Sequence, residues 1–184
     1  MKQSGIILLI FSFFIILSCS DDKKETSQKT LKGHYKAIDT ITSVLLETVS
    51  GEAAQARNWK RFKNLFKPYA QLTAISHRQN SVHSTNFSLD EFIELADRNS
   101  RENSFVEVEM NENIEIFGNI AHVFQVYVSK SGKDKSSHRG INSYQLVFDQ
   151  GRWWIVSVTW DIETPENRIP SKFLGTDKRE VLPS

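Results

Sequence analysis

The sequence predicts an α+β fold in which helices come first and a bent antiparallel sheet follows. Between residues 38 and 96, three stretches carry apolar residues at every third or fourth position, the period of amphipathic helices. From Phe105 onward they alternate with polar residues, the period of β-strands. Helices and strands in separate halves of a chain are typical of α+β domains, and a bent sheet covered by helices encloses a concave space.

Residues 1–19 have the pattern of a signal peptide with a lipid attachment site. Lys2 precedes an apolar run over residues 6–17, which is too short for a membrane-spanning helix. The run ends in Ile16-Leu17-Ser18-Cys19, which resembles the lipobox of bacterial lipoproteins. The resemblance implies removal of residues 1–18 and lipidation of Cys19. The alternative is an ordinary secretory peptide with a chance cysteine, but no better small-residue cleavage site follows.

The lipidation motif implies a location in the bacterial cell envelope. We expect the protein to be attached to the outer membrane through the lipid on Cys19. The sequence does not distinguish the periplasmic face of that membrane from the cell surface. Ser20-Asp21-Asp22 resembles an acidic export tag of surface lipoproteins, and a merely soluble linker is an equal alternative.

The amino-acid composition limits how the rest of the chain can be organised and which partners it can bind. Residues 20–30 are charged and polar, so we expect 19–33 to be a lipid-anchored flexible tether. Residues 34–174 form one domain of ordinary size, and 175–184 a polar tail. Cys19 is the one cysteine, so the domain depends on its core rather than on disulfides. The formal charge of +1 argues against a nucleic-acid partner.

Three helices are expected in the first half of the domain. The first carries Ile38, Ile41, Leu45 and Val49 at helical spacing and stops at Ser50-Gly51. The second has an apolar stripe from Trp59 to Phe66, ends before Pro68 and turns a basic face to solvent (Arg57, Lys60, Arg61, Lys63 and Lys67). The third begins with the capping box Ser88-Leu89-Asp90-Glu91.

The second half of the domain is predicted to form β-strands. Residues 105–116 alternate Val106, Val108 and Met110 with Glu107 and Glu109, and the polar interruption at 111–113 suits a β-bulge. The Gly118-Asn119 turn leads into a strand to Val128, and residues 129–140 are a polar connection. A last hairpin joins 141–148 to 153–162 through residues 149–151. Both faces of its second strand are apolar, so we expect a central strand with Trp153 and Trp154 buried.

Four stretches together resemble one known superfamily. These are residues 59–66 (WKRFKNLF), 117–121 (FGNIA), 139–143 (RGINS) and 151–161 (GRWWIVSVTWD). They are similar to the nuclear transport factor 2-like superfamily, which includes polyketide-cyclase-like (SnoaL-like) and ketosteroid-isomerase-like proteins. The resemblance implies a cone-like roll, with N-terminal helices packed on a strongly curved, mixed but mainly antiparallel sheet. It also implies a pocket at the open end, frequent dimers through the outer sheet face, and no fixed chemistry.

The position of the superfamily's general base is occupied here by a tyrosine. In catalytic members an Asp in a Phe-x-x-Asp-Ala setting serves as the base, and the matching stretch is Phe66-Lys67-Pro68-Tyr69-Ala70. A phenol with a pKa of about 10 is a poor base at neutral pH, so the match favours binding over catalysis. We expect the Tyr69 hydroxyl to face the cone interior beside Trp160.

Other candidate catalytic residues are few. His122 should face Glu115 across a hairpin, as a cross-strand contact or, less favoured, as a catalytic pair. Asp161 either caps the turn before Pro165 or points into the pocket as an acid or base. His77 and His83 fall in a loop-like stretch without partners at metal spacing. We therefore expect no metal site and no cofactor.

Aromatic residues are the expected ligand contacts, since pockets for small molecules are mainly apolar. The set is Trp59, Phe62, Tyr69, Tyr144 and Trp160.

Three function hypotheses follow from these residues. The leading one is a non-catalytic envelope module that binds a small apolar ligand or a protein partner through the cone. The second is a small enzyme of isomerase, dehydratase or cyclase type that uses the same pocket. The third is a structural subunit of a homodimer.

Overall fold

The computed structural model describes residues 21–78, 81–132 and 136–175. The chain divides into two units, residues 1–34 and residues 35–184, and the second unit contains the whole sheet. Cys19 and the segments 1–18 and 176–184 lie outside the described residues, so the predictions for the signal peptide, the lipid and most of the tail remain predictions.

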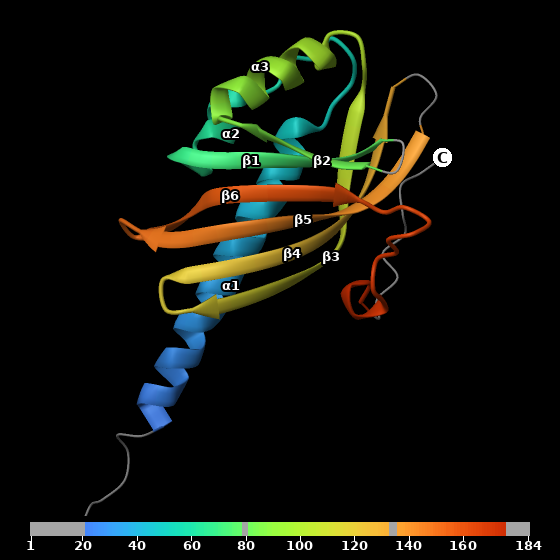
Figure 1. The fold of residues 1–184 in the computed structure, drawn as a ribbon. Helices are drawn as coiled ribbons and strands as arrows, with labels where there is room; N and C mark the ends of the chain where they lie inside the picture. The colour runs from blue at the N-terminus through green and yellow to red at the C-terminus, as the bar shows by residue number, and fades with distance from the viewer. Residues whose placement is uncertain (1–20, 79–80, 133–135, 176–184) are drawn as a thin grey trace, which may run out of the picture. The chain divides into compact units, whose positions relative to one another are not determined.

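The fold is α+β, as predicted, with helices packed on a mixed sheet of six strands (Figure 1). The strand order is β2-β1-β6-β5-β4-β3, so the sheet is open. Among the described strand pairs, β1–β6 is parallel and the others are antiparallel. The elements are α1 (Asp21–Val49), α2 (Trp59–Lys63), β1 (Phe66–Arg78), β2 (Ser81–Phe87), α3 (Leu89–Ser100), β3 (Phe105–Phe117), β4 (Ile120–Ser131), β5 (Ser136–Asp149), β6 (Arg152–Ile162) and a 3-10 turn, Ser171–Phe173.

Helix α1 ends where predicted but begins much earlier. Its last residue is Val49, and Ile38, Leu45 and Leu46 are buried in the core. The helix begins at Asp21, within the segment expected as a flexible tether. Lys, Glu and Gln are good helix formers, and extending a helix that is already nucleated costs little. Among the described helices, none has the length and apolar character needed to cross a membrane.

Arg57 closes the carboxyl end of α1 instead of lying on a solvent-facing helix surface. Its guanidinium is buried and donates hydrogen bonds to four backbone carbonyls, those of Val49, Gly51, Glu52 and Gln55. These carbonyls belong to or follow the last turn, where no helical N–H is present to bond them. The prediction of a basic face that includes Arg57 is therefore wrong for this residue.

The second predicted helix is shorter than expected, and two strands follow it. Helix α2 ends at Lys63, and Phe66 already belongs to β1. The stretch around His77 and His83, expected as a loop, is the β1–β2 hairpin. The side chains of β2 are almost all exposed, so this edge strand has no apolar alternation by which it could be recognised.

The later elements agree closely with the predictions. Both hydrogen bonds of the Ser88 capping box at the start of α3 are present. The β3–β4 register shifts between Glu109 and Asn111, next to the expected bulge. Gly118 has a φ of 56° in the β3–β4 turn, a conformation that glycine adopts without strain. The predicted connection 129–140 is shorter than expected, because β4 continues to Ser131 and β5 begins at Ser136.

Strand β6 is central, between β1 and β5, as its apolar pattern predicts. Trp153 is 1% exposed and packs against Phe148 at a ring-centroid distance of 5.4 Å. Trp154 is only half-buried, so the expectation that both rings are buried is wrong for this residue. On the outer face its ring is covered by Arg152, whose Cζ atom lies 3.5 Å from the ring centroid, rather than by a helix.

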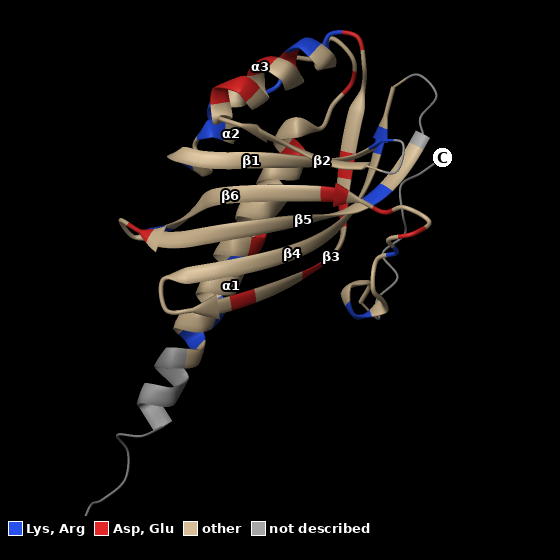
Figure 2. Ribbon diagram, in the orientation of Figure 1, with Lys and Arg blue, Asp and Glu red and all other residues tan. Residues whose placement is uncertain are grey.

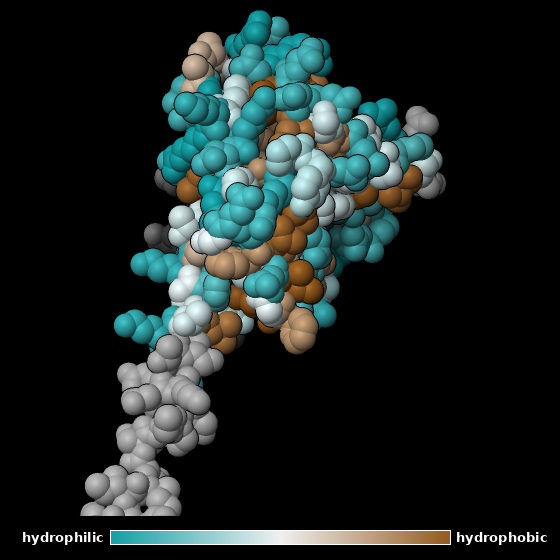
Figure 3. All heavy atoms as spheres, turned by 90° about the vertical axis from the view of Figure 1, so that its left-hand side faces the viewer, coloured by the Kyte–Doolittle hydropathy of each residue, from teal (hydrophilic) through white to brown (hydrophobic). Residues whose placement is uncertain are grey.

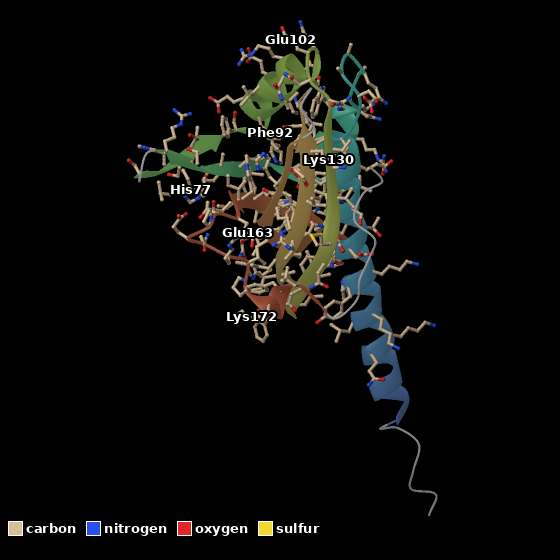
Figure 4. All side chains as sticks on the ribbon, turned by 90° about the vertical axis from the view of Figure 1, so that its right-hand side faces the viewer. His77, Phe92, Glu102, Lys130, Glu163 and Lys172 are labelled. Atoms are coloured by element: carbon tan, nitrogen blue, oxygen red, sulfur yellow. The ribbon has the colours of Figure 1, made fainter. Side chains whose placement is uncertain are left out.

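The outer sheet face is partly covered by the C-terminal segment. Phe173 stacks on Phe124 at 5.2 Å between ring centroids, and its carbonyl accepts a hydrogen bond from Asn111. Figure 4 shows α1 on one side of the sheet and Glu163 and Lys172 on the other. Phe117 and Ile120, at the β3–β4 turn, are exposed. Figure 3, which views the molecule from the side of this turn, shows apolar side chains (brown) scattered among hydrophilic ones (teal). The expected dimer surface is thus partly occupied by the chain itself.

Candidate functional site

An inner cavity of about 140 Å³ lies between the helices and the inner sheet face. Most of its walls are aliphatic or aromatic, and only two polar residues line it. The lining residues are Leu45, Val49, Phe62, Leu72, Phe92, Phe105, Glu107, Asn142, Val158 and Trp160. Every helix and four of the six strands contribute to it, so the cavity depends on the complete domain.

A wider outer pocket of about 600 Å³ adjoins the inner cavity. Val49, Phe92 and Phe105 line both spaces, so a ligand could extend from one into the other. Figure 4 shows Phe92 between α3 and the sheet, and Glu102, a residue of the outer pocket, beyond the end of α3. Trp59 also lines the outer pocket and is held to α3 by a 3.0 Å hydrogen bond from its indole N–H to Asp97.

Glu107 is the acidic residue of the inner cavity. Its Oε1 accepts a 2.8 Å hydrogen bond from Nδ2 of Asn142. Burial raises the pKa of Glu107 to about 7, against the opposing effect of the Asn142 hydrogen bond. A carboxyl group in this state can accept or donate a hydrogen bond near neutral pH.

A buried polar network continues from Asn142 away from the cavity. Gln125 is fully buried and accepts hydrogen bonds from the Tyr144 hydroxyl at 2.8 Å and from Asn142 Nδ2 at 3.4 Å. Its own Nε2 donates to Glu109 at 3.1 Å. The network therefore connects the cavity residue Glu107 to Glu109 through two amide side chains.

Glu109 belongs to an acidic cluster beneath α1, together with Asp39 and Glu112. One carboxylate oxygen from each of the three lies within 4.8 Å of the others, and Figure 2 shows acidic residues along β3. Burial, reinforced by the negative charge of Glu109, raises the pKa of Glu112 to about 7, and Thr42 donates a 3.0 Å hydrogen bond to it. Carboxylate oxygens are the ligands that hard cations prefer, so among the described residues these three could hold a metal ion.

Comparisons with known proteins identify the fold. No protein-family model matches the chain, and no curated protein matches it in sequence. Solved structures do match. The β subunit of a putative aromatic-ring-hydroxylating dioxygenase from Novosphingobium aromaticivorans is 12% identical, with a TM-score of 0.58 over 73% of this chain and 92% of its own. A hexachlorocyclohexane dehydrochlorinase from Novosphingobium barchaimii is also 12% identical, with a TM-score of 0.54 over 78% and 91%.

A nuclear transport factor 2-like protein of unknown function from Silicibacter pomeroyi is 15% identical, with a TM-score of 0.49 over 72% of this chain and 98% of its own. This domain has the nuclear transport factor 2-like fold. The superfamily resemblance seen in the sequence is thereby confirmed at the level of the fold. At such identities the likeness extends to the fold alone, because one fold supports many functions.

The nuclear transport factor 2-like fold brings most of the predicted aromatic residues to one region. Phe62 and Trp160 line the inner cavity, and Trp59 lines the outer pocket. Tyr144 is fully buried in the core, and its hydroxyl donates a hydrogen bond to Gln125.

Tyr69 lies elsewhere, and the expectation that it faces the interior is wrong. Its side chain is 69% exposed, and it lines a shallow pocket with Gln71 and Asn86. The reason is the early end of α2: Tyr69 lies in a strand whose buried positions are Ala70 and Leu72. The residue that matches the superfamily's base in sequence therefore has a different place in this chain.

Asp161 and His122 both lie on the outer side of the sheet. Asp161 contacts His77 Nε2 at 2.7 Å, so neither expected role, turn cap nor cone-facing acid, describes its position. His122 pairs with Glu115 in the β3–β4 register, as expected, and contacts the Ser143 hydroxyl at 3.1 Å. These contacts stand apart from the inner cavity.

Sequence reasoning missed Glu107 as a site residue. The alternation in β3 identified a strand but not which of its faces lines the cavity: Val108 is 38% exposed and Glu107 lines the cavity. The available signal was Asn142, which alternates with Tyr144 and Leu146 on one face of its strand, because a buried amide needs a polar partner.

Proposed function

We propose that this domain binds a small, largely apolar molecule in the inner cavity and holds one polar group of that molecule at Glu107. The observation that carries the proposal is the lining of the cavity, which is apolar except for Glu107 and Asn142. Apolar walls with one or two placed polar groups are typical of small-molecule sites. An apolar cavity of about 150 Å³ can hold benzene, so this cavity is suited to a single ring.

Phenol and benzene, titrated into the protein and followed by NMR chemical shifts, test this proposal. We expect phenol to bind about tenfold more tightly than benzene, because its hydroxyl can donate a hydrogen bond to the Glu107 carboxylate. In Glu107→Leu the preference should vanish or reverse.

The matched control is Glu115→Leu, since Glu115 lies on the same strand and is exposed. This control should keep the preference of the wild type. Equal affinities for the two probes in the wild-type protein, or shifts that map away from Phe62 and Trp160, would contradict the proposed site.

A second candidate function, proton-transfer catalysis, is favoured by one observation. Burial holds the pKa of Glu107 at about 7, which suits a group that both takes and gives protons at neutral pH. Acetophenone in deuterated water is a suitable probe, because a general base would exchange the hydrogens next to its carbonyl. Exchange that depends on Glu107 and is lost in Glu107→Gln would favour the enzyme over the binding module.

We also propose that a lipid on Cys19 holds the domain at the membrane of the bacterial cell envelope. The support is the apolar run before Cys19 and the lipobox-like Ile16-Leu17-Ser18-Cys19. Cys19→Ala should abolish labelling with radioactive palmitate, because only the thiol can accept the lipid. Ser18→Ala, which keeps a small residue before the cysteine, should label normally. Continued labelling of Cys19→Ala would exclude this attachment site.

A further inference from the structure

Gln125 lies at the centre of the polar network behind the cavity. Its side chain is fully buried on β4, and three of its hydrogen bonds are made to Tyr144, Asn142 and Glu109. A buried amide is costly unless its donors and acceptors are matched, so its orientation is strongly selected.

Glu109 selects that orientation. A carboxylate only accepts hydrogen bonds, so Nε2 of Gln125 must face it, and the 3.1 Å contact is made in this way. The carbonyl oxygen of Gln125 then faces the opposite direction, toward the Tyr144 hydroxyl and the Asn142 amide, and both donate to it. The proximity of Asp39 and Glu112 places further negative charge on the side that Nε2 faces.

The orientation of Gln125 in turn determines that of Asn142. Nδ2 of Asn142 donates both to Gln125 and to Glu107, at 3.4 and 2.8 Å. If Gln125 were reversed, its N–H groups would meet those of Asn142, donor against donor. Asn142 would have to turn and offer its carbonyl oxygen to Glu107, which only a protonated carboxyl group could bind.

We propose that Gln125 is the positioning residue of the inner cavity, because it holds the Asn142 amide with an N–H group toward Glu107. Glu107 is thereby kept as a hydrogen-bond acceptor, so the cavity selects ligands that carry a hydrogen-bond donor, such as a phenol or an alcohol, over simple ketones. This selection of the ligand class rests on the proposed binding function. The positioning itself does not, and it can be measured without a ligand.

The test is the pKa of Glu107, measured by ¹³C NMR titration of its side-chain carboxyl in the unliganded protein. In Gln125→Met, which keeps the length of the side chain, the pKa of Glu107 should rise by about one unit, a tenfold change in proton affinity. Tyr127 and Tyr144 also interact with Glu107, but burial raises the pKa of both above that of a free tyrosine, so neither titrates near neutral pH.

The matched control is Gln145→Met, the same change at an exposed position of β5, and it should leave the Glu107 pKa where it is. A folded Gln125→Met protein with an unchanged Glu107 pKa would overturn the proposal. If that variant does not fold, a pH titration of the wild-type protein provides the test. The NMR shifts of the Asn142 side-chain amide protons should change with the same midpoint pH as the Glu107 carboxyl. A different midpoint, or no change, would refute the positioning.

Phenol and acetophenone separate the two proposals. Wild-type protein should bind phenol more tightly than acetophenone at pH 8, and Gln125→Met should lose most of that preference. If the Glu107 pKa moves as expected but neither probe binds the wild type, the positioning stands and the proposed binding function fails. If both probes bind with equal affinity, the inferred ligand class is wrong.

Discussion

Replacement of Trp153 by alanine should lower the free energy of unfolding by about 3–5 kcal/mol, the range for truncating a large buried aromatic residue. Trp153 is 1% exposed in the central strand β6 and is among the largest fully buried side chains of the described residues. Domains of this size have total stabilities of roughly 5–15 kcal/mol, so the loss is a large share. Chemical denaturation, followed by circular dichroism, measures it.

Trp154→Ala is the matched comparison, because the neighbouring ring is half-buried and rests against Arg152 on the outer face. We expect a clearly smaller loss, since partial burial removes less apolar surface from water. Equal losses for the two variants would mean that the outer face of β6 is covered as well as its inner face. An unchanged stability of Trp153→Ala would contradict the central place of β6.

Replacement of Glu107 by glutamine should stabilise the protein at neutral and alkaline pH but not in acid. In the folded protein burial raises the pKa of Glu107 from 4.5 to about 7, so the folded state holds this proton more tightly than the unfolded chain does. The wild type therefore loses stability as the pH rises from about 4.5 through 7. Glutamine does not titrate, so the variant should gain about 3 kcal/mol over the wild type at pH 8, at 1.36 kcal/mol per pKa unit.

Urea denaturation at pH 4, 6 and 8 measures the difference between Glu107→Gln and the wild type. The two proteins should be equally stable at pH 4, where the carboxyl is protonated in both states. Glu112 titrates in the same range, but it is present in both proteins and so largely cancels from the difference. Glu115→Gln, an exposed position on the same strand, should follow the wild type at every pH. If the difference in stability between Glu107→Gln and the wild type is the same at pH 8 as at pH 4, the folded protein does not raise the pKa of Glu107.

Local signals in the sequence were sufficient for most of the elements. The Ser88 capping box, the carboxyl end of α1 at Val49, the Gly118 turn and the central strand β6 all depend on residues close together in the chain. The β1–β2 hairpin was missed, because an exposed edge strand needs no apolar alternation. Tyr69 was misplaced for a related reason: its stretch pairs with β6, far away in the sequence, and that pairing overrides the helical pattern before it.

The sequence by itself determined the α+β class, the central strand with the buried Trp153, the aromatic residues Phe62 and Trp160 as cavity contacts, and the resemblance to the nuclear transport factor 2-like fold. Only the tertiary structure decided which polar residues face the cavity. Glu107 and Asn142 come from different strands and meet only when the sheet is formed, and the charge state of Glu107 depends on the burial that results. Hydrophobic periodicity indicates which face of a strand is apolar. It cannot indicate two polar residues that are buried together, whose burial is possible because each provides the hydrogen-bond partner of the other.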